Sequence, residues 1–267
     1  MKLACQERLI PGETFAEKLR NLERYGFDAV ELDGAALNHA EDLAYHVAAL
    51  ADSPVRACSI CGGHPAELVH PERVHRQACV DALKRHLERA ARLGAVGVIT
   101  VPIFNSSPRV PDLTPWMARQ DIERCLLEAM LAELVPFAES VGAAILLEPL
   151  NRYESNSLPR QEDGAAIVRE VGSPAVRLMS DTFHMHIEEP DTPAAIRAVG
   201  DTIGHVHLAD NTRREPGSGD IDFAAILAAL REVGFTGHMA FECGLTGPAD
   251  EVLPRSVRFL RGLMAQD

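Results

Sequence analysis

The chain has 267 residues, a hydrophobic content of 46% and a formal net charge of −13. That charge argues against a nucleic-acid surface, which needs clustered Lys and Arg to neutralise phosphates, and no stretch approaches the roughly 20 apolar residues of a membrane span. The N-terminus, MKLACQERLI, lacks the long apolar core of a signal peptide, so we expect a cytoplasmic protein without nucleic-acid or membrane partners.

Apolar runs typical of strands alternate with helical patterns through the first half of the chain. The predicted strands lie near residues 2–5, 28–32, 54–60 and 96–102. A helix is expected over ETFAEKLRNLERYG, ending at Gly26. Longer helices are predicted from Pro71 to Leu93 and from Gln120 to Val141, the second with a kink or break at Pro136.

The second half continues this alternation with four more apolar runs. They are AAILLEP, AVRLMSD, IGHVHLAD and GHMAFECG, and a helical pattern follows each. Eight strands alternating with helices in a chain of this length predict an α/β fold, a single (β/α)8 TIM barrel forming one domain over residues 1–267. A doubly wound open sheet shares the alternation, but no GxGxxG follows the first strand.

Each of these four runs carries an acidic or imidazole side chain at its end: Glu148, Asp181, His207 and Glu242. The carboxyl ends of the strands of a parallel barrel open onto one mouth, so these side chains should converge there. Three carboxylates and one imidazole form a mostly oxygen site suited to one divalent ion, with Mn²⁺ expected first and Co²⁺ or Mg²⁺ as alternatives. Ordinary polar residues at strand ends are the competing interpretation, which four successive occurrences disfavour.

Two further segments have more than one interpretation. Cys58 and Cys61 form a CxxC without a second pair at zinc-site spacing, and we expect reduced cysteines at a strand end. The segment 102–119 is the longest irregular stretch and contains the only tryptophan, Trp116. We expect it to cover the substrate, with a surface loop or an oligomer contact as alternatives.

Four motifs in the second half resemble one known family. LEPLNRYE, SDTFHMHIEE, GHVHLADNTRREPGSGDIDF and FEC are similar to the strand-end motifs of the xylose-isomerase-like TIM-barrel sugar isomerases and epimerases, most closely the D-tagatose, D-psicose and L-ribulose 3-epimerases. The resemblance spans Leu147 to Glu242, whereas the first half shares only the barrel rhythm. It implies that Glu148, Asp181, His207 and Glu242 bind one divalent ion, and that Glu154, His184 and Arg213 contact the first two oxygens of a small sugar.

The chemistry of such an enzyme explains this set of residues. Removing the proton next to a ketone requires a base and stabilisation of the enediolate, which a chelating metal supplies as a Lewis acid. Glu148 and Glu242 are the expected catalytic pair, one abstracting the proton and the other returning it on the opposite face. The resulting hypothesis is a 3-epimerase of ketoses or keto sugar acids, forming a homodimer or homotetramer.

Other functions compete with this hypothesis. A 1,2-isomerase of the hydroxypyruvate or keto-inositol type would use similar ligands, although LNRYE matches it poorly. A three-zinc endonuclease would need extra ligands and a basic groove, and a non-catalytic sugar-binding barrel would be expected to have lost a ligand. Asp210 replaces a glutamate found in several ketose 3-epimerases, so the choice among ketohexoses, ketopentoses, sugar acids and phosphorylated sugars stays open.

Residues around the motifs carry smaller predictions. His205 is expected to be a core histidine rather than a ligand, and Arg214 a surface arginine. The glycines of PGSGD are expected to turn the chain into a helix capped by Asp222, with phosphate binding as the alternative.

Overall fold

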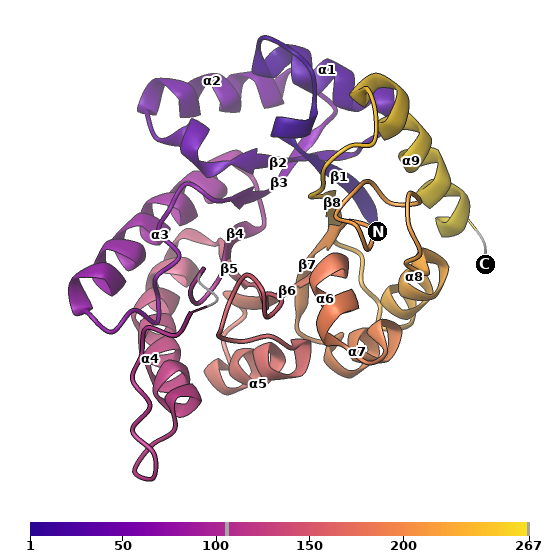
Figure 1. Cartoon of the computed structure of the whole chain (residues 1–267). Coiled ribbons are helices and arrows are strands. Elements are labelled where there is room, and N and C mark those ends of the chain that lie inside the picture. The colour runs from indigo at the N-terminus through magenta and orange to yellow at the C-terminus, as the bar shows by residue number, and fades with distance from the viewer. Residues whose placement is uncertain (105–106, 266–267) are drawn as a thin grey trace.

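A computed structural model describes residues 1–104 and 107–265. Eight parallel strands, paired in chain order and closed between the first and the last, form a barrel surrounded by helices (Figure 1). The strands are β1 (Lys2–Gln6), β2 (Ala29–Asp33), β3 (Arg56–Cys61), β4 (Gly97–Thr100), β5 (Ala144–Leu147), β6 (Val176–Asp181), β7 (Ile203–Leu208) and β8 (His238–Phe241). The predicted TIM barrel is confirmed.

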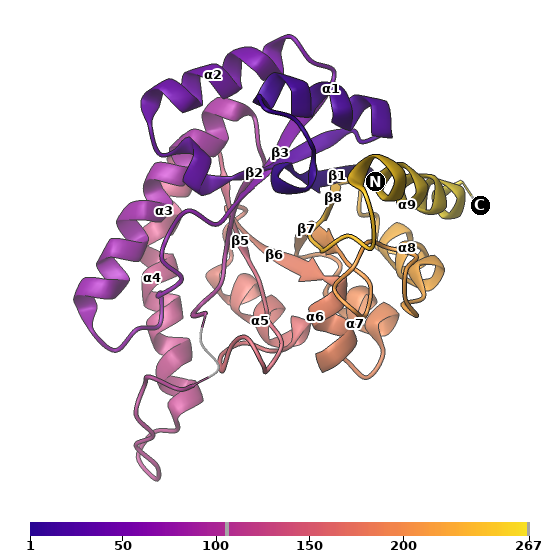
Figure 2. The ribbon, with the colours of Figure 1, turned by 45° about the horizontal axis from the view of Figure 1, so that its top comes forward.

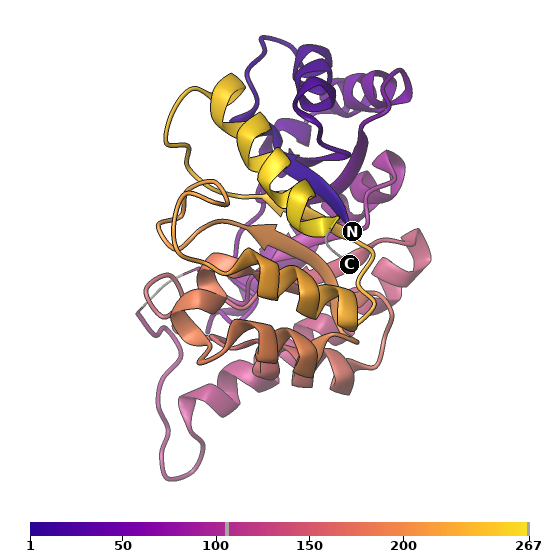
Figure 3. The ribbon, with the colours of Figure 1, turned by 90° about the vertical axis from the view of Figure 1, so that its right-hand side faces the viewer.

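The helices form the outer layer of the barrel, as the tilted and side views show (Figures 2 and 3). They are α1 (Phe15–Tyr25), α2 (Ala40–Ala51), α3 (Arg73–Leu93), α4 (Arg119–Val141), α5 (Gln161–Val171), α6 (Thr182–Glu188), α7 (Thr192–Val199), α8 (Phe223–Glu232) and α9 (Ala249–Met264), with 3₁₀ turns at Glu7–Leu9 and Gly34–Leu37. Among the described helices, none combines the length and the apolarity that crossing a membrane requires.

Local sequence signals explain where α1 begins and ends. Thr14 accepts a hydrogen bond from the backbone N–H of Glu17, while the Glu17 side chain accepts one from the backbone of Thr14, which forms a capping box. Gly26 ends the helix in the left-handed region at φ 91°, which a glycine adopts without steric cost. The predicted end at Gly26 is confirmed.

The possible break at Pro136 is wrong. Helix α4 continues through this proline to Val141. The proline ring removes one N–H from the ladder but does not end the helix, because Leu131, Leu134 and Ala138 around it are fully buried against the barrel. Packing of the apolar face therefore outweighs the local helix-breaking tendency.

Two faces of each strand pack differently. Alternate residues such as Leu3 and Val30 belong to the large apolar cluster between the strands and the helices. The opposite face holds small side chains, for example Ala4 and Ala29, at the interior of the barrel. Gln6 and Glu31 lie two residues further along β1 and β2, so they share this interior face. Small side chains therefore leave room for polar groups inside the barrel.

The predicted lid, residues 102–119, is described in two parts, because residues 105–106 lie outside the described residues. Phe104 lines a cavity at the mouth. Residues 107–118 extend outward beside the start of α4 (Figure 1), and Trp116 among them is 75% exposed. In this conformation Phe104, and not Trp116, reaches the cavity, and a covering role for the segment stays a prediction.

Candidate active site

The four predicted ligands come together at the carboxyl ends of four strands. Glu148 follows β5, Asp181 ends β6, His207 lies near the end of β7 and Glu242 follows β8. One ligand atom from each lies within 4.8 Å of the others. Asp181 and His207 are fully buried and Glu148 is nearly so, which places the cluster at the floor of the barrel mouth.

The donor set fits a divalent cation. Three carboxylates and one imidazole provide hard oxygen ligands and one nitrogen. Oε1 of Glu148 and Nδ1 of His207 are buried without a hydrogen-bond partner, and burying unpaired polar atoms is costly. A bound cation would satisfy both atoms, so the cluster can hold a metal ion.

The pKa values of two carboxyl groups in the cluster shift in opposite directions. Burial raises the pKa of Glu148 well above its usual range, and the nearby charges of Glu242 and Asp181 add to this. Burial also opposes ionisation of Asp181, but Arg213, His184 and His207 together outweigh it, so the pKa of Asp181 is lowered. Such divergent pKa values within one cavity are typical of functional sites.

Arg213 points from the β7–α8 loop into the cluster. Its guanidinium donates a hydrogen bond to Oδ2 of Asp181 at 2.6 Å and another to Glu242, and it lies 4.8 Å from the centre of the Phe183 ring. Its backbone has φ 55°, which is uncommon for a residue other than glycine. The neighbouring Arg214 is exposed, and its side chain donates a hydrogen bond to the carbonyl of Leu245, as expected for a surface arginine.

Asp210 holds the loop that carries Arg213. Its buried carboxylate accepts backbone hydrogen bonds from Gly217 at 2.9 Å, Gly219 at 2.8 Å and Ile221 at 3.1 Å. The N–H groups of both glycines of the PGSGD turn are therefore occupied by Asp210, and that of Ser218 donates to the carbonyl of Glu215, which favours the turn interpretation over phosphate binding. Asp222 caps α8 by accepting from the backbone of Ala225, as predicted.

The other predicted substrate contacts also line the mouth. His184 is buried, and its Nε2 lies 3.8 Å from Oε1 of Glu148. Glu154 accepts a hydrogen bond from Asn151 at 2.9 Å. Asn151 also donates to Nδ1 of His184, and sequence analysis did not single it out. Its place inside the LNRYE motif was the available signal.

A buried glutamate in the barrel centre was also missed. Glu31 on β2 is fully buried and accepts hydrogen bonds from both His207 and His205. His205 lies deeper in the barrel than His207, and its bond to Glu31 agrees with the predicted core role. A charged residue inside the strand AVELD was the signal for Glu31, but it did not indicate a partner.

Two cavities flank the cluster. One of 240 Å³ is lined by Phe104, His64, Glu154, His184 and Arg213 among others. The second, of 190 Å³, lies on the side of β1 and β2. Cys61 and Glu242 line both. Cys61 and Cys58 are free thiols, as expected.

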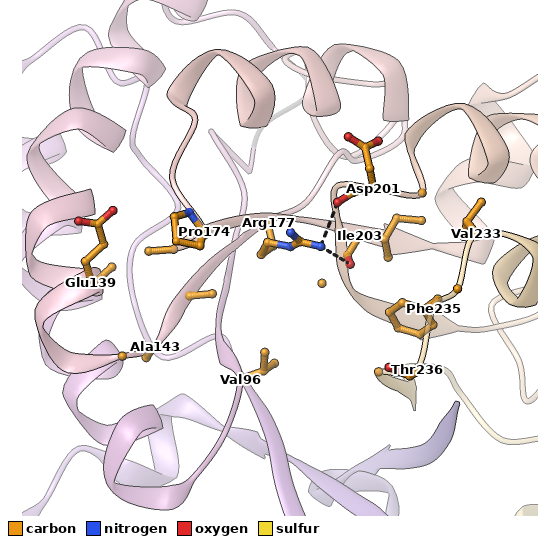
Figure 4. A pocket seen from close by; sticks show the side chains of 18 residues that line it. Val96, Glu139, Ala143, Pro174, Arg177, Asp201, Ile203, Val233, Phe235 and Thr236 are labelled. Carbon is orange, nitrogen blue, oxygen red and sulfur yellow. Dashed lines mark hydrogen bonds between the residues drawn. The ribbon is translucent and has the colours of Figure 1, made fainter.

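A larger cavity of 790 Å³ lies at the other end of the barrel, among the loops that precede β5 to β8 (Figure 4). Its central charged side chain, Arg177, donates hydrogen bonds to the backbone carbonyls of Asp201 and Ile203, both at 3.1 Å. That arrangement ties two strands together and gathers no catalytic groups. The smaller cavities at the carboxyl ends of the strands are therefore the candidate site, since that end carries the active sites of such barrels.

Comparison with known proteins agrees with the barrel fold. Residues 19–263 match the family described as xylose isomerase-like TIM barrel. The chain is 30% identical over 244 residues to the 3-dehydro-D-guloside 4-epimerase of Escherichia coli, covering 91% of this chain and 92% of that protein. It is 27% identical over 277 residues to the ketose 3-epimerase of Arthrobacter globiformis, covering 100% and 92%. The crystal structure of a 3-keto-D-glucoside 4-epimerase from E. coli superposes with a TM-score of 0.89 at 29% identity, covering 98% of this chain and 99% of that one.

Proposed function

The chain belongs to the xylose isomerase-like TIM barrel family, and on this premise we propose that it is a divalent-metal-dependent epimerase of keto sugars. It inverts a hydroxyl-bearing carbon next to the keto group. The observation that carries the proposal is the convergence of Glu148, Asp181, His207 and Glu242 within 4.8 Å at the barrel mouth. Mn²⁺ is the proposed ion, with Co²⁺ or Mg²⁺ as alternatives.

Glu148 and Glu242 are the proposed acid and base. They come from β5 and β8, which are not neighbours in the barrel, so they approach the cluster from different sides. One carboxylate removes the proton from the carbon next to the keto group, and the other carboxyl group returns a proton to the opposite face. When bound, the divalent ion supplies Lewis-acid stabilisation of the negative charge that develops on the keto oxygen.

Three further side chains are proposed to hold the substrate oxygens. Arg213 and His184 face the cluster, and Glu154 lines the same 240 Å³ cavity. Because Nδ1 of His184 accepts from Asn151, its Nε2 carries the hydrogen and can donate to a substrate oxygen. The guanidinium of Arg213 offers a fixed positive charge for the oxygen that becomes negative.

Two positions of the keto group fit this chemistry. In a 2-ketose the inverted carbon is C3, and the resemblance of the second half of the chain to ketose 3-epimerases favours this reaction. In a 3-keto glycoside the corresponding carbon is C4. The match to the E. coli 4-epimerase over 91% of this chain favours that second candidate. Both reactions invert the carbon adjacent to a ketone and need the same pair of glutamates.

Solvent exchange identifies the reaction. The metal-loaded enzyme is incubated in D₂O with D-fructose, L-ribulose and a methyl 3-keto-D-glucoside, and the products are read by NMR. Inversion of a ketose places deuterium at C3, and inversion of the glycoside places it at C4. Deuterium at C1 together with an aldose product would instead show a 1,2-isomerase. No turnover of any keto sugar would contradict the proposal.

The glutamate pair has its own test. Glu148→Gln and Glu242→Gln should each lower kcat by at least about 10², because general acid–base catalysis contributes on this scale. Glu123→Gln is the matched control, since Glu123 is a buried glutamate on α4 whose oxygen accepts from Asn156, outside the cluster. If Glu123→Gln lowered kcat as much as the other two variants do, the effect would come from packing rather than from catalysis.

A further inference from the structure

Four side-chain donors surround the buried carboxylate of Glu31. Its Oε1 accepts from Nε2 of His207 at 2.8 Å and from Nε2 of Gln6 at 2.9 Å. Its Oε2 accepts from Oγ of Ser59 at 2.6 Å and from Nε2 of His205 at 2.9 Å. A fully buried carboxylate costs free energy unless it is well compensated, and these four donors compensate it.

The bond to His207 decides which nitrogen faces the cluster. Since Glu31 takes the hydrogen on Nε2, the ring directs Nδ1 toward the carboxylates, 3.0 Å from Oε2 of Glu242 and 3.6 Å from Oδ2 of Asp181. A neutral imidazole with its hydrogen on Nε2 has its lone pair on Nδ1. The lone pair that a cation needs is therefore placed by Glu31.

Gln6 connects Glu31 to Glu242, a second proposed ligand. Its Nε2 donates to Oε1 of Glu31 at 2.9 Å and to Oε1 of Glu242 at 3.0 Å. The orientation of this amide is fixed, because its oxygen accepts from Nε of Arg8 at 2.7 Å and an arginine can only donate. Gln6 thus links the two glutamates where β1 closes the barrel against β8.

We propose that Glu31 and Gln6 are positioning residues that orient His207 and Glu242 for the ion. The proposal rests on the metal site of the proposed function, and it concerns two strands in the half of the chain without recognisable motifs. Outer partners of metal-bound histidines fix the ring and its hydrogen, and their loss weakens metal affinity by about 10- to 100-fold. Neither residue is required to touch the ion or the sugar.

The test measures metal binding without relying on turnover. Metal-free protein is titrated with Co²⁺ by calorimetry, and the visible absorption spectrum of the bound Co²⁺ is recorded. Glu31→Gln keeps the shape of the side chain but turns one acceptor oxygen into a donor nitrogen, so the hydrogen bonds that this oxygen accepted are lost. We expect a weaker Kd by about 10- to 100-fold and a changed spectrum. Gln6→Met removes the link to Glu242 and should change both readouts in the same direction.

Ser180→Ala is the matched control. Ser180 is buried on β6 beside Asp181, and its hydroxyl donates away from the cluster to Oε1 of Gln161 at 2.6 Å. This variant loses a buried hydrogen bond of the barrel but should leave the Co²⁺ affinity and spectrum unchanged. Near-ultraviolet circular dichroism checks that each variant is folded. If Glu31→Gln is not, Gln6→Met tests the positioning roles.

The outcomes separate this proposal from the proposed function. Wild-type affinity and an unchanged spectrum in the folded variants would overturn the positioning roles, even if the wild-type enzyme epimerises keto sugars. Weakened Co²⁺ binding in the variants, together with a wild-type protein that turns over no keto sugar, would support the positioning roles and refute the proposed function.

Discussion

Asn151 donates its side-chain amide to Nδ1 of His184 over 2.7 Å, and both residues are buried. The Asn151 amide cannot turn over freely, because its oxygen accepts the backbone N–H of Tyr153 at 2.9 Å. His184 must then carry its hydrogen on Nε2, which faces Oε1 of Glu148 and Oδ2 of Asp181 at 3.8 and 3.9 Å. Burial also lowers the pKa of His184, which favours the neutral ring.

This relationship predicts the effect of replacing Asn151. Asn151→Ala removes the 2.7 Å side-chain bond and leaves Nδ1 of His184 with the longer 3.4 Å bond from the backbone N–H of residue 151, so the ring is held less firmly and kcat/KM should fall by about 10-fold or more. The metal content, measured by elemental analysis, should stay at the wild-type value. Asn151→Asp should instead place a carboxylate beside His184 and favour the protonated ring. The part of the kcat/KM pH profile that reports deprotonation of His184 should therefore move to higher pH. An unchanged profile would show that His184 does not act as a neutral donor.

The metal cluster predicts one divalent ion per chain. Asp181→Ala and His207→Ala should each abolish metal binding and activity, because each removes one of four ligands. Metal binding to the native state should also raise the melting temperature of the wild-type protein, through mass action, and not that of the two variants. Elemental analysis and thermal unfolding with and without a chelator check both points. An active wild-type enzyme free of Mn, Co, Mg and Zn would contradict this prediction.

Neighbouring arginines provide a matched pair for substrate binding. Arg213→Ala should lower kcat/KM by about 10² or more, because it removes a charged contact proposed to form with the substrate oxygens. Arg214→Ala should leave kcat/KM near the wild-type value, since this side chain is exposed and donates to the backbone carbonyl of Leu245 rather than into the cluster. Steady-state kinetics on metal-loaded proteins distinguish the two. If both variants changed kcat/KM equally, Arg213 would have a structural role in its loop and no contact with the substrate.

The charges of the cluster predict how metal binding depends on pH. In the metal-free protein, burial raises the pKa of Glu148. Burial would lower the pKa of His207, but Glu31, Glu242 and Asp181 together outweigh it and raise this pKa. Both groups hold protons that must leave when they become ligands, so Co²⁺ affinity should rise with pH and binding should release protons. Calorimetry in buffers of different ionisation enthalpy measures the released protons. Affinity that falls as pH rises would refute the ligand roles of this pair.

The lowered pKa of His238, at the other end of the barrel, predicts that the protein becomes less stable at acid pH. Burial lowers its pKa from 6.5 to about 4. The unfolded chain therefore binds more protons between these values, and the free energy of unfolding should decrease as pH falls from 6.5 to 4. His238→Asn should flatten this dependence, because the substituted side chain does not titrate. Urea unfolding of metal-free protein across this range provides the measurement.

The sequence alone determined the barrel and the convergence of the four proposed ligands at its mouth. Local patterns of apolar residues predict the strands and helices, and the alternation of these elements implies parallel strands. Parallel strands in a closed barrel direct their carboxyl ends to one mouth, so Glu148 and Glu242 could be placed together without knowing any contact between them. The capping of α8 by Asp222 was equally visible, because a cap depends on residues adjacent in the chain.

Only the tertiary structure decided the partners inside the barrel. The hydrogen bonds of Glu31 to Ser59 and His207 cross from β2 to β3 and β7, and the bond of Gln6 to Glu242 crosses the closure between β1 and β8. Which interior side chains meet depends on strand register and on the small residues around them, and a local pattern encodes neither. The continuity of α4 through Pro136 was decided in the same way, because tertiary packing outweighed the local preference of proline.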